Sequence, residues 1–186
     1  MNEVDYYLMA TACPKCDKGP WEIDSPASGE SLPQPATVRA HCKNCRARKT
    51  FTVTLDHDPA GQGPSAEQIN PGPEPSRIID LGQWLSLFAL MVESAAASED
   101  PVQARLIGYR AALCLSEALK FYADDELPPE SAFFREDSIE AFRGAPERFA
   151  RQRLCDMQSK LPKLDTMAGR VSRDRQAKRK WWRFWQ

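Results

Sequence analysis

The chain has 186 residues, of which 42% are hydrophobic and 27% are charged, and its formal net charge is -1. This composition is typical of a globular protein and argues against a disordered or strongly polyionic chain. The most hydrophobic stretch, residues 84–92, ends at Glu93 and is far shorter than the roughly 20 residues that cross a bilayer.

The N-terminus and the cysteines indicate a compartment. The first five residues include two acids, Glu3 and Asp5, where a secretory signal would carry positive charge. Four of the six cysteines have metal-ligand spacing, which suits a reducing environment in which disulfides are rare. We therefore expect a cytoplasmic protein.

Two cysteine pairs dominate the first 58 residues. Each has the spacing C-x2-C, and the ligating candidates are Cys13, Cys16, Cys42 and Cys45. Short alternating segments at residues 21–24, 37–40 and 50–55 predict three strands around these pairs. Four thiolates in this arrangement favour tetrahedral Zn2+ over the alternative of redox-active or unpaired thiols.

With short strands around both pairs, the sequence resembles the zinc ribbon family over about residues 7–56. The resemblance implies that Cys13, Cys16, Cys42 and Cys45 are the ligands of a structural Zn2+. Four thiolates close the coordination shell, whereas catalytic zinc keeps an open position. The chain departs from the family in the long loop between the two cysteine pairs. It also has Asp17 and Arg46 directly after the pairs, where the family often has glycine.

A break in pattern separates this segment from the rest of the chain. Residues 59–75 contain five prolines and three glycines, which predicts a linker over residues 59–76. Downstream, Asp80 with Gln83 resembles a capping box, and Asp100 with Pro101 marks a second helix start. We expect a helical hairpin with a turn near Ser98, followed by shorter helices, over residues 77–168.

The last segment, residues 169–186, is basic and aromatic. Residues 170–186 carry seven basic residues and one acid. Such a tail could fold back onto the protein, bind an anionic membrane surface, or stack on nucleic-acid bases. A second basic cluster lies beside the second cysteine pair. The partner-binding candidates from both clusters are Arg46, Arg48, Lys49, Lys178, Arg179, Lys180, Trp181, Trp182, Arg183 and Trp185.

Motifs for catalysis are missing from the sequence. No histidine follows His57, which removes Ser-His-Asp and Cys-His arrangements from the helical segment. Phosphate-binding glycine motifs are also absent. We expect no catalytic residues and no enzymatic activity.

The prediction is therefore an α+β protein, with a small three-stranded antiparallel zinc ribbon followed by a mainly helical domain, either a helical hairpin or a bundle of three to four helices. We expect a non-enzymatic adaptor with structural Zn2+ and a protein partner. A nucleic-acid-binding regulator and a peripheral membrane adaptor are the alternatives, and homo-oligomerisation stays open.

Overall fold

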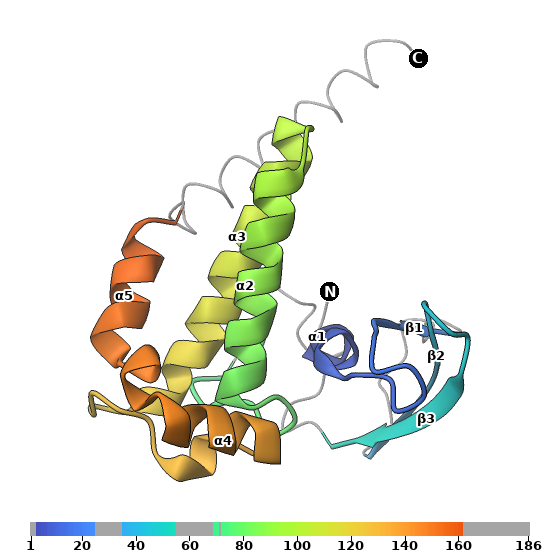
Figure 1. The fold of residues 1–186 in the computed structure, drawn as a ribbon, viewed down its shortest axis with the longest axis horizontal. Helices are drawn as coiled ribbons and strands as arrows, with labels where there is room; N and C mark the ends of the chain where they lie inside the picture. The colour runs from blue at the N-terminus through green and yellow to red at the C-terminus, as the bar shows by residue number, and fades with distance from the viewer. Residues whose placement is uncertain (1–2, 25–34, 55–68, 71, 162–186) are drawn as a thin grey trace.

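The computed structural model describes residues 3–24, 35–54, 69–70 and 72–161, and it has the predicted α+β architecture. A three-stranded antiparallel sheet lies beside an assembly of helices (Figure 1). The strands are β1 (Trp21–Ile23), β2 (Ala36–Cys42) and β3 (Arg48–Val53), and the α-helices are α1 (Glu3–Ala10), α2 (Leu81–Ala97), α3 (Pro101–Leu119), α4 (Glu136–Gly144) and α5 (Arg151–Ser159).

The sheet follows chain order, β1-β2-β3, and both pairings are antiparallel. Side chains alternate between its two faces. Val38, Ala40 and Cys42 of β2 are buried together with Phe51 and Val53 of β3. The residues between them point outward, so the sheet has one apolar face and one polar, exposed face.

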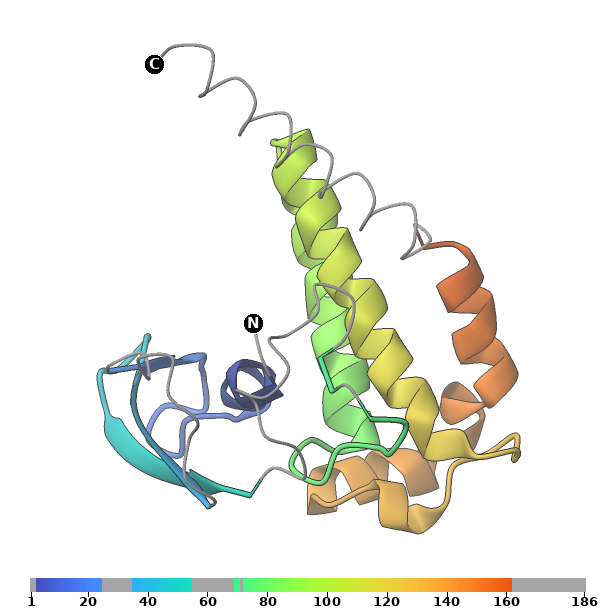
Figure 2. The ribbon, with the colours of Figure 1, turned by 180° about the vertical axis from the view of Figure 1, so that it is seen from behind.

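The helical hairpin forms as the sequence predicts. Asp80 caps α2, accepting a hydrogen bond from the Gln83 amide while the Gln83 side chain accepts one from the Asp80 amide. Asp100 caps α3 through the Val102 amide at 2.9 Å. Helices α2 and α3 pack side by side and are the longest of the described elements. Figure 2 shows them from behind.

Shorter elements close the base of this hairpin. They are the 3-10 helices η1 (Lys120–Tyr122), η2 (Glu130–Ala132) and η3 (Pro146–Phe149), together with α4, and α5 packs along α3. Phe133, Phe142 and Phe149 form an aromatic cluster in this region. A buried Tyr122 hydroxyl donates to the Phe149 carbonyl at 2.6 Å and ties the chain after α3 to the start of α5.

Helix α1 joins the sheet to the helices, and the sequence analysis assigned no helix there. Its Tyr6 packs against Trp84 of α2, with ring centroids 5.7 Å apart. Val4 and Leu8 belong instead to the core under the sheet, and Tyr7 meets Phe51 edge-on. In Figure 1, α1 lies between the sheet and α2.

The end of the proline-rich segment also packs against the helices. Ile69 is buried in the helical core, and the Asn70 amide donates to the carboxylate of Glu117 at 3.2 Å. Lys120 donates to the carbonyls of Asn70 and Gly72 at 2.9 and 2.8 Å. Residues 59–68 and residue 71 of the predicted linker lie outside the described residues. Within the described part of the chain, no helix has the length and apolar character needed to cross a membrane.

Candidate metal centre

The four predicted ligands come together from two turns built on the same backbone plan. In each turn the amide of the first cysteine bonds to the carbonyl five residues later, Cys13 to Lys18 at 2.6 Å and Cys42 to Ala47 at 2.8 Å. The carbonyl of that cysteine accepts from the residue four positions on, at 2.8 Å from Asp17 and 2.9 Å from Arg46. Each turn therefore wraps around its first cysteine.

Left-handed backbone closes both turns. Asp17 has a φ of 53° and Arg46 a φ of 61°, a region that favours glycine. At these two positions the zinc ribbon pattern often has glycine. The turn geometry is retained with a side chain present, at the cost of backbone strain.

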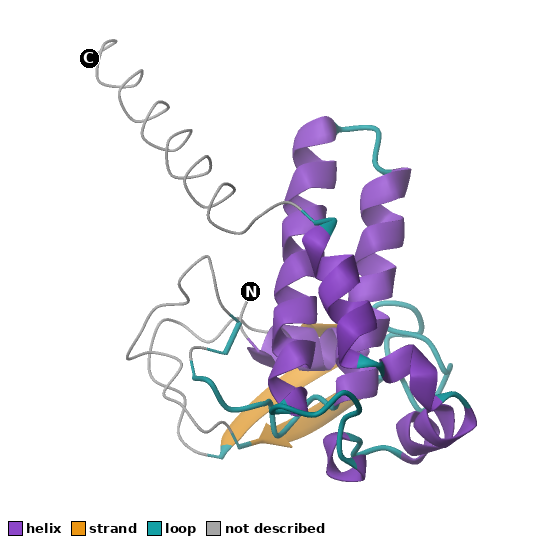
Figure 3. Ribbon diagram, turned by 90° about the vertical axis from the view of Figure 1, so that its left-hand side faces the viewer, coloured by secondary structure: helices purple, strands orange, loops and turns teal. Residues whose placement is uncertain are grey.

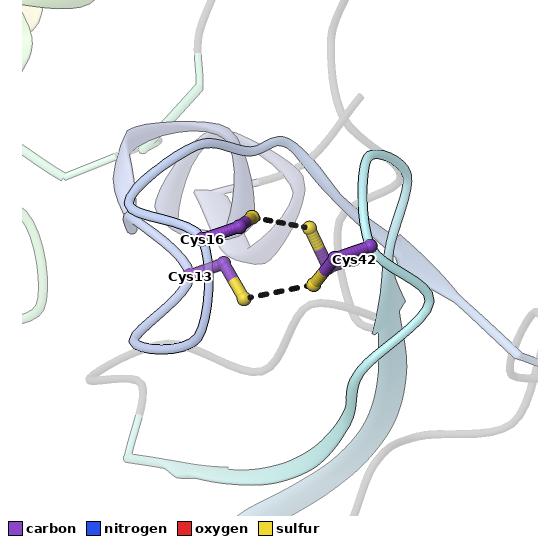
Figure 4. Close-up of side chains that lie close together, drawn as sticks. Cys13, Cys16 and Cys42 are labelled. Carbon is purple, nitrogen blue, oxygen red and sulfur yellow. Dashed lines mark hydrogen bonds between the residues drawn. The ribbon is translucent and has the colours of Figure 1, made fainter.

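The sulfur atoms have the spacing that a tetrahedral zinc site requires. Cys13 Sγ lies 3.6 Å from Cys45 Sγ, and Cys16 Sγ lies 3.7 Å from Cys42 Sγ (Figure 4). All four sulfurs fall within 4.8 Å of one another. Zn–S bonds of about 2.3 Å in a tetrahedron place neighbouring sulfurs about 3.8 Å apart. The residues fit a Zn2+ ion bound between the two turns.

Two of the four thiols have pKa values that differ from that of an ordinary cysteine. A hydrogen bond from the Asn44 side chain is the main factor that lowers the pKa of Cys16 to about 6. The Ala47 amide would lower the pKa of Cys45, but burial and the neighbouring cysteines raise it to about 11. The Cys16 thiol thus ionises more readily than an ordinary thiol while Cys45 holds its proton, and a bound cation would displace that proton.

Packing around the cysteines holds the site in shape. Cys13 and Cys42 are fully buried and belong to the same core as Val4, Leu8 and Trp21. Trp21 meets Phe51 edge-on at 5.1 Å between ring centroids. Cys16 and Cys45 are only partly buried, so the site lies at the edge of the small core with two sulfurs toward the surface.

His41 precedes Cys42 but takes part in a different interaction. Its Nδ1 lies 2.6 Å from Asp24 Oδ1, and Arg46 Nη1 lies 3.1 Å from its Nε2. Because a guanidinium can only donate, Nε2 accepts from Arg46 and Nδ1–H donates to Asp24. The histidine therefore links β1 to the second cysteine turn rather than adding a fifth ligand.

Most basic residues beside the second turn have contacts within the protein. Arg46 is engaged with His41, and Lys43 lies 3.9 Å from Glu22. Lys49 places its ammonium 5.0 Å from the Phe51 ring centroid. Arg48 is exposed and stands opposite His41 in the sheet. The outer candidates Lys178, Arg179, Lys180, Trp181, Trp182, Arg183 and Trp185 lie outside the described residues.

Two features that hold parts of the chain in place were not predicted from the sequence. Glu117 and Lys120 form a partly buried ion pair at 2.9 Å that anchors Asn70 and Gly72. Helix α1 fixes the metal-binding segment against α2. The i, i+3 spacing of Glu117 and Lys120 was visible in the sequence, but their distant backbone partners were not.

Comparison with known proteins adds no assignment. Neither the family models, nor the curated proteins, nor the solved structures contain a match to this chain. The functional interpretation therefore rests on the geometry of the site and its surroundings.

Proposed function

We propose that this chain is a non-enzymatic interaction module whose N-terminal sheet is stapled by one structural Zn2+ on Cys13, Cys16, Cys42 and Cys45. The observation that carries the proposal is the set of four sulfurs within 4.8 Å of one another, contributed by two matching turns. When bound, the ion supplies folding free energy to a small segment with a limited core. Four thiolates would fill its shell and leave no position for substrate.

The surface that such a staple would present is the outward face of the sheet. We call it the sheet face and define it by five exposed residues: Thr37, Arg39, Arg48, Thr50 and Thr52. They occupy β2 and β3 in paired register, with Thr37 opposite Thr52 and Arg39 opposite Thr50. The contacts of α1 with both cores hold this face rigidly relative to the helices.

Its chemistry favours a protein partner. Threonine hydroxyls and two arginines offer hydrogen bonds on a surface that strand pairing has already ordered, which lowers the entropy lost on binding. Glu22 lies 3.9 Å from Lys43, and Asp24 bonds to the histidine that Arg46 contacts, so acids interrupt what would otherwise be a uniformly positive field at this end of the sheet. A nucleic-acid surface would need such a field to attract phosphates.

The test is isolation of the full chain from its own cell, with zinc, protein, nucleic acid and lipid measured on one sample. We expect one zinc per chain and a co-purifying partner protein. The double variant Arg39→Glu with Thr52→Arg should lose this partner and keep its zinc. Arg153→Glu, at an exposed position on α5, is the matched control and should keep the partner. Nucleic acid or lipid that remains bound to the double variant would instead support the regulator or membrane alternatives.

A further inference from the structure

The tip of the α2–α3 hairpin extends beyond the other described elements. Helix α5 packs beside α3 but ends short of the hairpin tip, as Figures 1 and 3 show. Gln158 of α5 contacts Ser116 of α3 at 3.4 Å, and Leu161 still packs against the helical core. No described atom lies within 4 Å of the position that a Cβ on Gly108 would occupy, about two turns nearer the hairpin tip.

This part of the hairpin is apolar and acidic. Leu90 is 50% exposed and Val102 is 73% exposed, and Val92 and Leu106 are each 39% exposed. Leu90 also lines an open hollow of about 640 Å3 together with Leu154 and Met157 of α5. Residues 90–108 contain three acids, Glu93, Glu99 and Asp100, and one base, Arg105.

Among the described residues, Glu93 and Glu99 make no ion pair, and both are exposed. Asp100 bonds to the Val102 amide and keeps its carboxylate at the turn. The tip is therefore a negatively charged surface with apolar side chains beside it, and such exposed patches generally mark contacts.

We propose that the C-terminal segment, residues 162–186 of the same chain, covers this surface. The segment follows Leu161, which packs against the helical core. Its charge is opposite to that of the tip, with seven bases and one acid in residues 170–186. Its aromatic residues, Trp181, Trp182, Phe184 and Trp185, match the exposed apolar side chains.

The length of the segment allows this contact. From Ser116, level with Gln158, to the start of α3 at Pro101 is about 22 Å at the helical rise. The stretch from Gln158 to Lys178 spans about 30 Å even at that rise, and more if extended.

Tryptophan fluorescence tests the contact in the full chain. Trp21 and Trp84 are 5% and 0% exposed, so quenching by acrylamide reports mainly on Trp181, Trp182 and Trp185. We expect little quenching in low salt and clearly more in 1 M NaCl, where the Debye length is only about 3 Å. The double variant Glu93→Lys with Glu99→Lys should raise quenching in low salt.

Two further variants sharpen the result. Glu140→Lys with Glu147→Lys makes the same charge change at exposed positions near the base of the hairpin and should leave quenching unchanged. Adding Lys178→Glu and Lys180→Glu to the hairpin variant should restore part of the protection. Circular dichroism checks that each variant keeps its helices.

Several outcomes would overturn the proposal. One is equal quenching in all variants, and another is protection that appears only with an oligonucleotide or with phosphatidylglycerol vesicles. A third is protection that follows dimer formation in sedimentation, because the occupant would then be the tail of a second copy. Zinc content and partner capture by the sheet face do not depend on this contact. The quenching experiment can therefore fail without affecting the test of the proposed function.

Discussion

At the scale of single residues, the two positions that close the cysteine turns require left-handed backbone and are therefore strained. Asp17 and Arg46 both adopt left-handed backbone, which costs about 1 kcal/mol or more for a residue with a Cβ. Aspartate tolerates this region better than arginine because its short polar side chain bonds locally. Arg46 recovers some stability through its contact with His41.

Replacing Asp17 by glycine should therefore stabilise the protein. Relief of the left-handed strain outweighs the extra entropy of glycine in the unfolded chain, and we expect a net gain on the order of 0.5 kcal/mol. Urea unfolding of the zinc-loaded protein measures the change. Gly19→Ala is not a suitable control because it alters the same turn, whereas Ser94→Gly, in the exposed part of α2, should destabilise. A loss of stability in Asp17→Gly would contradict the strain argument.

Single residues also show what sequence patterns can predict. The capping role of Asp80 was predicted from Gln83 three positions later, because both partners are local. Its second oxygen accepts from the amides of Phe134 and Arg135 at 3.1 and 3.2 Å. Those partners lie more than 50 residues away, and a single sequence contains no periodicity that links them. Local chemistry was therefore predictable here, and the tertiary use of the same carboxylate was not.

At the scale of elements, α1 explains why the sequence analysis missed a helix. It has only eight residues, and short helices depend on tertiary packing rather than on intrinsic propensity. Its apolar residues serve two cores, with Tyr6 toward α2 and Val4 and Leu8 toward the sheet. Division between two surfaces weakens the one-sided pattern by which amphipathic helices are recognised.

Truncating Leu8 to alanine should weaken the segment that holds the metal. Leu8 is 1% exposed, and Leu→Ala at buried sites costs about 2–5 kcal/mol. The free energy of unfolding in urea gives the loss, and competition with a chromogenic chelator should show weaker zinc binding. Val102→Ala, at a 73% exposed position, is the control and should change stability little. Unchanged zinc affinity in Leu8→Ala would argue that α1 does not support the site.

At the scale of the whole molecule, two cores share one chain. The helical core gathers Trp84, Leu115 and Tyr122, while the core under the sheet includes two of the cysteines themselves. The sequence predicted a change from strands to helices across the proline-rich segment. It could not predict that the cores touch, because the contact depends on α1 and on Ile78, which packs against both.

Removal of zinc should consequently unfold one part of the protein and spare the other. Without the ion, four ionisable thiols lie within 4.8 Å of one another and the small core loses its staple. The helical core contains none of these four cysteines and keeps its capped hairpin. In nuclear magnetic resonance spectra, the Trp21 indole N–H signal should move to its unfolded position after chelation, whereas the Trp84 signal should stay.

Matched cysteine variants separate the metal from general thiol effects. Cys45→Ser should reproduce the effect of chelation, because it removes one of the four ligands. Cys155→Ser, at a partly buried position on α5 outside the cluster, should keep both zinc and the Trp21 signal. Simultaneous loss of the Trp21 and Trp84 signals on chelation would mean that the metal supports the whole fold through α1, and not the sheet alone. Retention of both signals in the zinc-free protein would instead show that the small core folds without its ion.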